Sequence, residues 1–242
     1  MDFIGEINPH SSGQHRKILV ATDYFTKWIE AIPTRKADYN VVMKFFTENI
    51  FSRFGCPHKL VTNNAAAFRE KELVDICDSV GIKLVHSTSY YPQGNGLVES
   101  SNKSLIRIIK KLLEDNKKNL DSKLKYALWA NRVTIKKSTG NSSFKMVYGT
   151  DAVFLIQLTL PVANFLQTEQ DEEEEMENRI TDLAELHQIR EQLVEKVAAH
   201  QKEIKDVFER KAKTDNFQIG DLVLKWDALK EKKGNHGKFD AF

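Results

Sequence analysis

The sequence predicts an α/β domain with a mixed five-stranded sheet flanked by helices. Short segments rich in β-branched and aromatic residues alternate with segments whose apolar residues recur every three or four positions. The chain has 242 residues, of which 41% are hydrophobic, which is enough for one substantial core and a smaller second unit. The segment order suits a sheet with both antiparallel and parallel neighbours.

Five strands are predicted where short apolar stretches end at turn-forming residues. The first three form a meander, and each of the last two follows a helix. In chain order the predicted strands are MDFIGEI, RKILVATDY, KWIEAIP, HKLVT and IKLVHST.

Four helices are predicted around these strands from apolar residues at helical spacing. They are residues 38–53, the segment REKELVDICDSVG, a long helix from about Gly96, and LDSKLKYALWANRVT. In the last, Leu124, Leu128 and Trp129 are predicted to face the core. The long helix has its own apolar stripe, made of Leu97, Leu105, Ile108, Ile109, Leu112 and Leu113.

The second half of the chain divides into an acidic and an amphipathic part. Residues 161–178 carry a dense negative charge without an apolar stripe, which predicts a linker or a frayed helix start. Residues 179–214 predict one long helix, and 215–242 predict a turn and strand that need further strands to form a stable sheet. The stripe of the long helix comprises Ile180, Leu183, Leu186, Ile189, Leu193, Val197, Ile204 and Phe208.

The formal net charge of +2 hides two opposite blocks. Residues 101–150 contain 12 Lys and Arg against 3 Asp and Glu, a net of +9, whereas residues 151–200 contain 3 against 12, a net of −9. This division is typical of a polyanion-binding surface followed by a repelling linker. Two helix faces turned toward water are the alternative.

Composition also excludes several classes of protein. No run approaches the roughly 18 apolar residues of a membrane span, and the first residues lack the features of a signal peptide, so we expect an intracellular protein, nuclear or cytoplasmic. Cys56 and Cys77 have neither CxxC spacing nor a partnered histidine pattern. We expect two small buried thiols and no zinc site.

Glu99 stands at the head of the basic helix. Lys103 and Arg107 follow it at intervals of four residues, which places one potential metal ligand and two phosphate-binding cations on the same face. Lys110 and Lys111 continue the basic stretch. A carboxylate at this position also complements the helix dipole, which is the simpler interpretation of Glu99 alone.

The loop SYYPQGNG precedes this helix. Tyr91 can stack on a base or pack in the loop, and Gln93 and Asn95 can hydrogen-bond to phosphate or to base edges. Tyr90 and Tyr91 are adjacent, and packing is the commoner role of such a pair. Contact with nucleic acid is the alternative, and its candidate residues are Tyr91, Gln93 and Asn95.

The sequence resembles the integrase region of long-terminal-repeat retrotransposons of the gypsy class, relatives of retroviral integrases. The segments that carry the resemblance are MDFIG, ILVATDYFTKWIEAIP, FGCPHKLVTNNAAAF, YYPQGNGLVESSNKSL, ALWANR and FKMVYG. At the end, FQIGDLVLKWD and GKFD resemble the opening of that family's SH3-like domain. The resemblance implies a ribonuclease-H-like core over residues 1–160 and a truncated SH3-like module over 215–242.

The resemblance also implies an active site of two aspartates and a glutamate. The first aspartate matches Asp2 and the glutamate matches Glu99, while Asp23 resembles a family residue outside this trio and is expected to fix a turn. The second aspartate matches Asn63, in VTNNAAAF, and the spacing to Glu99 is retained, with 35 residues between them. The acid is therefore replaced at a catalytic position.

This replacement bears on the cofactor that the resemblance implies, a pair of Mg²⁺ or Mn²⁺ ions. Two such ions lie roughly 3.5–4 Å apart in two-metal sites and require carboxylate ligands. Asn63 offers a neutral amide oxygen, and Mg²⁺ gives up its water reluctantly, so we expect a weak metal site and impaired catalysis. An inactivating substitution and a decayed copy of the gene are equally compatible with the sequence.

The functional prediction is an integrase-type polynucleotidyl transferase that processes DNA 3′ ends and joins them to a target duplex. Its expected partners are DNA, both element ends and target, and further copies of itself. The alternative is a catalytically dead module that binds DNA and self-associates. A ribonuclease-H-like domain without a nucleic-acid role leaves the +9 segment unexplained.

Overall fold

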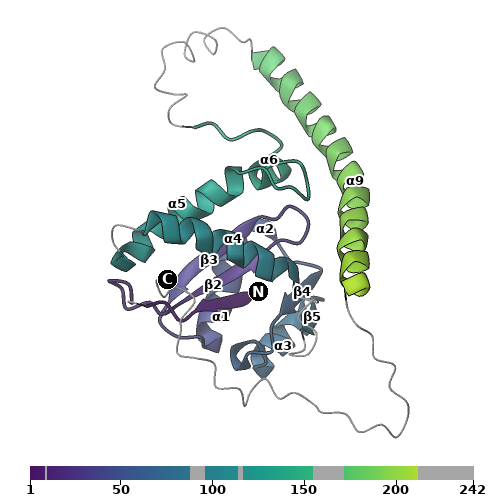
Figure 1. The fold of residues 1–242 in the computed structure, drawn as a ribbon. Coiled ribbons are helices and arrows are strands. Elements are labelled where there is room, and N and C mark those ends of the chain that lie inside the picture. Colours follow the sequence, from purple (N-terminus) through teal and green to yellow (C-terminus); the bar gives the residue numbers. More distant parts are fainter. Residues whose placement is uncertain (9, 88–95, 114–116, 155–171, 212–242) are drawn as a thin grey trace, which may run out of the picture. The chain divides into compact units, whose positions relative to one another are not determined.

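The chain forms two compact units, drawn in Figure 1. The computed structural model describes residues 1–8, 10–87, 96–113, 117–154 and 172–211. The first unit comprises residues 1–24 and 29–131, and the second comprises 25–28, 132–154 and 172–211, within the described residues. The predicted SH3-like module, 215–242, and residues 161–171 of the predicted linker lie outside the described residues.

Five strands form in the first unit at the predicted places. The strands are β1 (Asp2–Gly5), β2 (Lys17–Thr22), β3 (Ile29–Thr34), β4 (Lys59–Thr62) and β5 (Lys83–His86). The first three are antiparallel in the order β1-β2-β3, and β4 pairs with β5 in parallel. The predicted single sheet is thus replaced by two hydrogen-bonded sheets.

The reason lies in the backbone between β1 and β4. The Met1 nitrogen donates to the Val61 carbonyl oxygen at 2.5 Å, which links the two sheets at one point. Backbone N–H groups alternate between the two edges of a strand, so the Phe3 amide faces the same way as Met1. That amide instead donates to Asp2 Oδ1 at 2.8 Å. The Phe3 N–H group, which could have donated to a backbone carbonyl of β4, donates to the Asp2 side chain.

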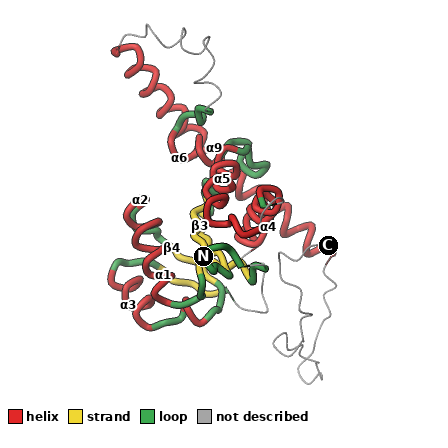
Figure 2. Tube along the Cα trace, turned by 90° about the vertical axis from the view of Figure 1, so that its left-hand side faces the viewer, coloured by secondary structure: helices red, strands yellow, loops and turns green. Residues whose placement is uncertain are grey.

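Strand β2 separates two hydrophobic layers. Ile18 and Val20 belong to a core with helices α4 (Gly96–Leu112) and α5 (Leu120–Val133). Leu19, between them, belongs to a core with α1 (Tyr39–Phe45) and α3 (Lys71–Ser79). This alternation follows from the two-residue repeat of a strand. Figures 1 and 2 show the strands between these two sets of helices. The first unit is therefore a helix–sheet–helix sandwich, as its segment order predicts.

The helices of the first unit match the predicted segments. They are α1 (Tyr39–Phe45), η1 (Phe46–Phe51), α2 (Ser52–Phe54), η2 (Ala66–Phe68), α3 (Lys71–Ser79), α4 (Gly96–Leu112), η4 (Lys117–Asn119) and α5 (Leu120–Val133, which runs into the second unit). The predicted helix over 38–53 forms as three consecutive pieces, α1, a π-helical turn and α2. Asp38 caps it, because its Oδ1 accepts from the Val41 amide at 3.0 Å.

Two burial predictions are wrong. Leu124 and Leu128 of α5 are buried as expected, but Trp129 is 39% exposed, because one further residue turns the helix by about 100° away from the core. Cys56 is exposed, whereas Cys77 is buried as predicted. Cys56 directly follows Gly55, where the helix has already ended at φ +79°, so no helical face carries it into the core.

The second unit contains α6 (Ser143–Tyr148) and α9 (Glu172–Lys211). Helix α9 begins within the acidic run, before the predicted start at residue 179. Arg190 on α9 donates to the Met146 carbonyl oxygen at 2.7 Å. The Arg132 guanidinium lies 4.3 Å from the centre of the Trp28 ring, which also meets Tyr148 edge-on.

Many apolar residues of α9 are either buried or well exposed. Leu186, Leu193 and Val197 are buried, and Leu186 lies near Gly149. A second group is exposed and comprises Met176, Ile180, Leu183, Val194, Ile204 and Val207. The predicted stripe is thus only partly covered by the chain itself.

No helix among the described residues is both long enough and apolar enough to span a membrane.

An ion pair on β3 yields a stability prediction. The Glu30 side chain is 6% exposed, and its Oε1 lies 2.6 Å from Arg53 Nη1. We predict that Arg53→Ala lowers the free energy of unfolding by about 1–3 kcal/mol, since a buried carboxylate loses a charged donor. Urea denaturation measures this loss.

The matched control is Lys17→Gln, which removes the more exposed pair with Glu6 at 3.0 Å. We expect it to cost less than about 1 kcal/mol. Equal losses for the two variants would contradict a special role for the Glu30 pair.

Candidate active site and nucleic-acid surface

Asp2 on β1 lies at the centre of a hydrogen-bonded cluster. Its Oδ1 accepts from Asn63 Nδ2 at 2.6 Å and from the Phe3 amide at 2.8 Å, and its Oδ2 accepts from Asn102 Nδ2 at 2.9 Å. The three donors come from the end of β4, from β1 itself and from α4. The structure therefore brings together two of the three predicted catalytic residues, Asp2 and Asn63, and adds Asn102.

The orientation of Asn63 follows from its neighbours. The Ala65 amide donates to Asn63 Oδ1 at 3.1 Å. Only the oxygen of the Asn63 side-chain amide can accept this hydrogen bond, since its nitrogen is a donor. The amide nitrogen of Asn63 must then face Asp2, where the carboxylate oxygen is a suitable acceptor. Asn63 thus presents a hydrogen-bond donor at the place where the resemblance implies a metal-binding carboxylate.

Asn102 was not predicted from the sequence. It is 4% exposed, and its Oδ1 is buried without a hydrogen-bond partner among the described residues. The available signal was its place three residues after Glu99, on the face of α4 that carries the apolar stripe. A polar residue on such a face requires a buried partner, and Asp2 is that partner.

Glu99 lies in the first turn of α4 and is exposed. Within the described residues it makes no hydrogen bond or ion pair, and no group of three or more His, Cys, Asp and Glu side chains is placed to hold a metal ion. Mg²⁺ and Mn²⁺ prefer oxygen ligands, and a two-ion site needs several carboxylates. The described residues, with a donor facing Asp2, do not fit the implied pair of ions.

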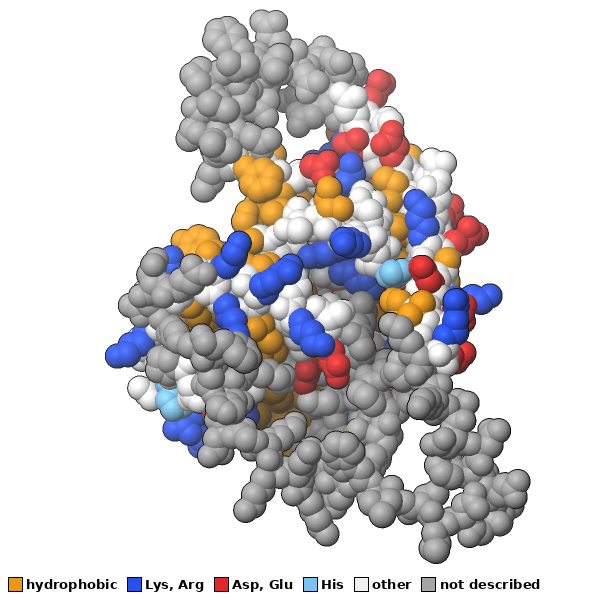
Figure 3. All heavy atoms as spheres, viewed as in Figure 1, with side chains coloured by type: hydrophobic (Ala, Val, Ile, Leu, Met, Phe, Trp, Pro, Cys, Tyr) orange, Lys and Arg blue, Asp and Glu red, His pale blue; other side chains and the backbone are white. Residues whose placement is uncertain are grey.

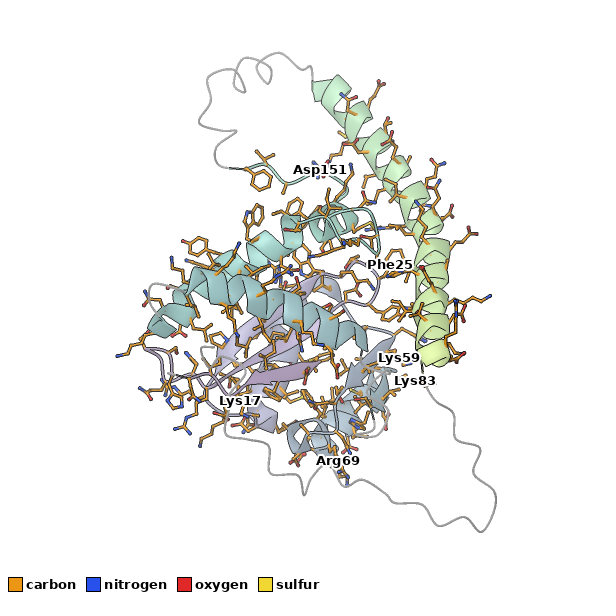
Figure 4. The ribbon with its side chains drawn as sticks, in the orientation of Figure 1. Lys17, Phe25, Lys59, Arg69, Lys83 and Asp151 are labelled. Atoms are coloured by element: carbon orange, nitrogen blue, oxygen red, sulfur yellow. The ribbon has the colours of Figure 1, made fainter. Side chains whose placement is uncertain are left out.

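The ends of the parallel strands β4 and β5 flank this cluster. Their first residues, Lys59 and Lys83, are cross-strand partners and are labelled in Figure 4. At their carboxyl ends Thr62, which is fully buried, lies with its Oγ1 2.9 Å from His86 Nδ1. This contact joins the last residues of β4 and β5, and Asn63 directly follows the last residue of β4.

Helix α4 carries the predicted basic surface. Lys103, Arg107, Lys110 and Lys111 are all exposed, and none forms an ion pair with another described residue. Residues four apart on a helix differ by roughly 40° in direction, so these cations and Glu99 share one side. The opposite side buries Leu105 and Ile109 in the core. Figure 3 shows Lys and Arg side chains gathered on the face over α4 and α5.

The remaining predicted residues have different outcomes. Tyr91, Gln93 and Asn95 lie outside the described residues. Asp23 is exposed directly after β2.

Comparison with known proteins agrees with this fold. Residues 1–92 match the family described as the integrase core domain. The chain is 33% identical over 150 residues to the Pol polyprotein of feline endogenous virus ECE1, which is 62% of this chain and 14% of that polyprotein. It is 32% identical over 139 residues to the Gag-Pol polyprotein of avian reticuloendotheliosis virus, 57% of this chain and 12% of that one.

A solved structure shows a similar fold. The simian T-cell lymphotropic virus intasome in complex with PP2A regulatory subunit B56 gamma contains a chain that matches with a TM-score of 0.51 and 22% identity. The match covers 60% of this chain and 52% of that one. Residues 1–92 are thus similar to the integrase core domain, and the chain has a fold like that of a chain in a retroviral intasome. It spans only a small part of the length of the retroviral polyproteins that it matches.

Proposed function

We propose that this chain is the integrase part of a gypsy-class retrotransposon, a polynucleotidyl transferase that acts on DNA and whose catalysis is impaired at Asn63. The observation that carries the impairment is the Asn63 amide nitrogen, which lies 2.6 Å from the Asp2 carboxylate. The match of residues 1–92 to the integrase core domain supports the class of reaction, processing of DNA 3′ ends and strand transfer. The resemblance implies Mg²⁺ or Mn²⁺ ligands at Asp2, Asn63 and Glu99, and the Asn63 amide would be at most a weak one.

A second candidate function is supported by the same amide. With Asn63 as a donor and Glu99 exposed, the chain can serve as a catalytically inactive module that binds DNA and associates with other copies. This function uses the parts of the molecule that do not depend on a metal ion: the basic side of α4 and the exposed residues of α9. The two candidates differ only in metal-dependent cleavage and joining.

We place the DNA on α4. Four exposed cations on one side of a helix, without described acidic partners, form a surface that lowers the free energy of a phosphate backbone nearby. Contacts from Tyr91, Gln93 and Asn95 remain a proposal for the loop that precedes α4. The DNA partners of this function are the element ends and the target duplex. Its proposed location is inside the cell, in the nucleus or the cytoplasm.

We place self-association on α9. Leu186 and Leu193 are already buried, so they do not form a pairing surface. The exposed apolar residues, at intervals of four, three and eleven, are Met176, Ile180, Leu183 and Val194. These intervals keep the four side chains on one side of a helix. A second copy of α9 is the occupant that we propose for this side.

The first prediction from this proposed function concerns catalysis. We expect strand transfer with Mg²⁺, measured on duplex oligonucleotides with recessed 3′ ends, to be at background for the unaltered chain. Asn63→Asp should raise it, and Asn63→Asp with Ala65→Gly should raise it further, because both changes restore the family pattern at these positions. Adding Glu99→Gln to the active variant should abolish the gain.

Strong strand transfer by the unaltered chain would contradict the proposed impairment. Equal background activity in all variants would favour the inactive module.

The second prediction concerns DNA binding. The logarithm of duplex affinity should fall linearly with the logarithm of salt concentration, with a slope of about −0.9 per phosphate neutralised. Lys103→Ala with Arg107→Ala should reduce the magnitude of this slope by roughly 2, since two phosphate contacts are lost. Fluorescence anisotropy across a salt series measures it.

The control is Lys202→Ala with Arg210→Ala, which removes the same charge from exposed positions of α9. If both double variants change the slope equally, net charge and not the α4 surface binds the DNA.

The third prediction concerns the oligomer. Sedimentation velocity at micromolar concentration should show self-association that Ile180→Asp with Val194→Asp removes, because charges would enter an apolar contact. Gln188→Asp with Gln192→Asp adds the same charge on the opposite side of α9 and should leave association unchanged. A monomer at every concentration would disprove pairing through α9.

A further inference from the structure

The Asp2 carboxylate is surrounded by hydrogen-bond donors. Donors from three elements reach its two oxygens, from the end of β4, from β1 and from α4. Two of these contacts join residues 61 and 100 positions apart in the sequence. Hydrogen bonds to a charged group are roughly twice as strong as neutral ones, so this cluster fastens three elements at one point.

A bound cation would have to displace this arrangement. It would need the lone pairs of Asp2 that Asn63 and Asn102 occupy, and it would need Asn63 to turn its oxygen inward. That turn breaks the Asn63–Asp2 bond and also the bond from the Ala65 amide to Asn63 Oδ1. The unused acceptor in the cluster, Asn102 Oδ1, is a single neutral oxygen, which is a poor substitute for carboxylates around Mg²⁺.

We propose that the amides of Asn63 and Asn102 take the structural place of a divalent cation, so that this chain folds and keeps its site together without metal. Asn63 is then a positioning residue for the strand β1, the end of β4 and the helix α4. The inference rests on the proposed function only in placing the family's acidic site at Asp2 and Asn63. It concerns folding, so it stands or falls separately from strand transfer and DNA binding.

The proposal implies that one substitution makes the fold depend on metal. Asn63→Asp would place a second carboxylate against Asp2 at the 2.6 Å contact and would remove the donor between them. Like charges at such a distance repel, and a divalent cation between them relieves the repulsion. The variant should therefore be less stable without metal and regain stability when Mg²⁺ binds to its folded state.

The test is thermal unfolding of the full chain without DNA, followed by circular dichroism in EDTA and in 10 mM MgCl₂ at equal ionic strength. We expect the Tm of the unaltered chain to be the same in both. For Asn63→Asp we expect a Tm lower by about 4–8 °C in EDTA, with most of the loss recovered in MgCl₂. The control Asn64→Asp makes the same charge change at the exposed neighbouring position and should match the unaltered chain.

Asn63→Ala separates the amide from the charge. It removes the donor without adding a carboxylate, so its Tm should fall equally in EDTA and in MgCl₂; this variant also decides the question if Asn63→Asp does not fold in either buffer. A Tm of the unaltered chain that rises with Mg²⁺, an Asn63→Asp variant that behaves like Asn64→Asp, or an Asn63→Ala variant with an unchanged Tm would each overturn the proposal.

Discussion

The hydrogen-bonded carboxylate of Asp2 is the interaction on which the arrangement of the first unit depends. It joins β1 to the end of β4 through Asn63 and to α4 through Asn102, and it takes the Phe3 amide out of the backbone ladder. This side chain helps to hold α4 beside β1, and among the described residues the backbone link from this end of the chain to β4 is the bond from Met1 to Val61. Asp2 is half-buried, and a carboxylate in such a place that lost these donors would lower the free energy of unfolding. The cluster therefore opposes separation of the three elements.

The two sides of helix α4 differ in chemistry. Leu105 and Ile109 are fully buried and fix the helix on the sheet, while the cations at 103, 107, 110 and 111 face solvent. A rigid, anchored helix keeps exposed cations at constant spacing, which is what a regular phosphate backbone can use. Asn102 lies at the border between the two sides and links α4 to β1 by donating to the Asp2 carboxylate.

The replaced acid and the retained surroundings have separate consequences. Chemistry with two metal ions depends on carboxylates at fixed places, and an amide that donates toward Asp2 removes one of them. Binding to DNA depends on cations elsewhere, and the fold depends on burial. A chain can therefore lose the first property and keep the other two, which is the physical basis for considering an inactive binding module beside an impaired enzyme.

The sequence by itself determined the strands, the helices and the basic side of α4, because these depend on periodicity and charge within short segments. It also placed Asp2 and Asn63 at one site through the resemblance to integrases. Only the tertiary structure decided that Asn63 acts as a donor, that Asn102 completes the cluster, that Trp129 and Cys56 are exposed, and which apolar residues of α9 are covered. These features depend on contacts between residues far apart in the chain, and a local pattern of residue types carries no information on which distant partner a side chain will meet.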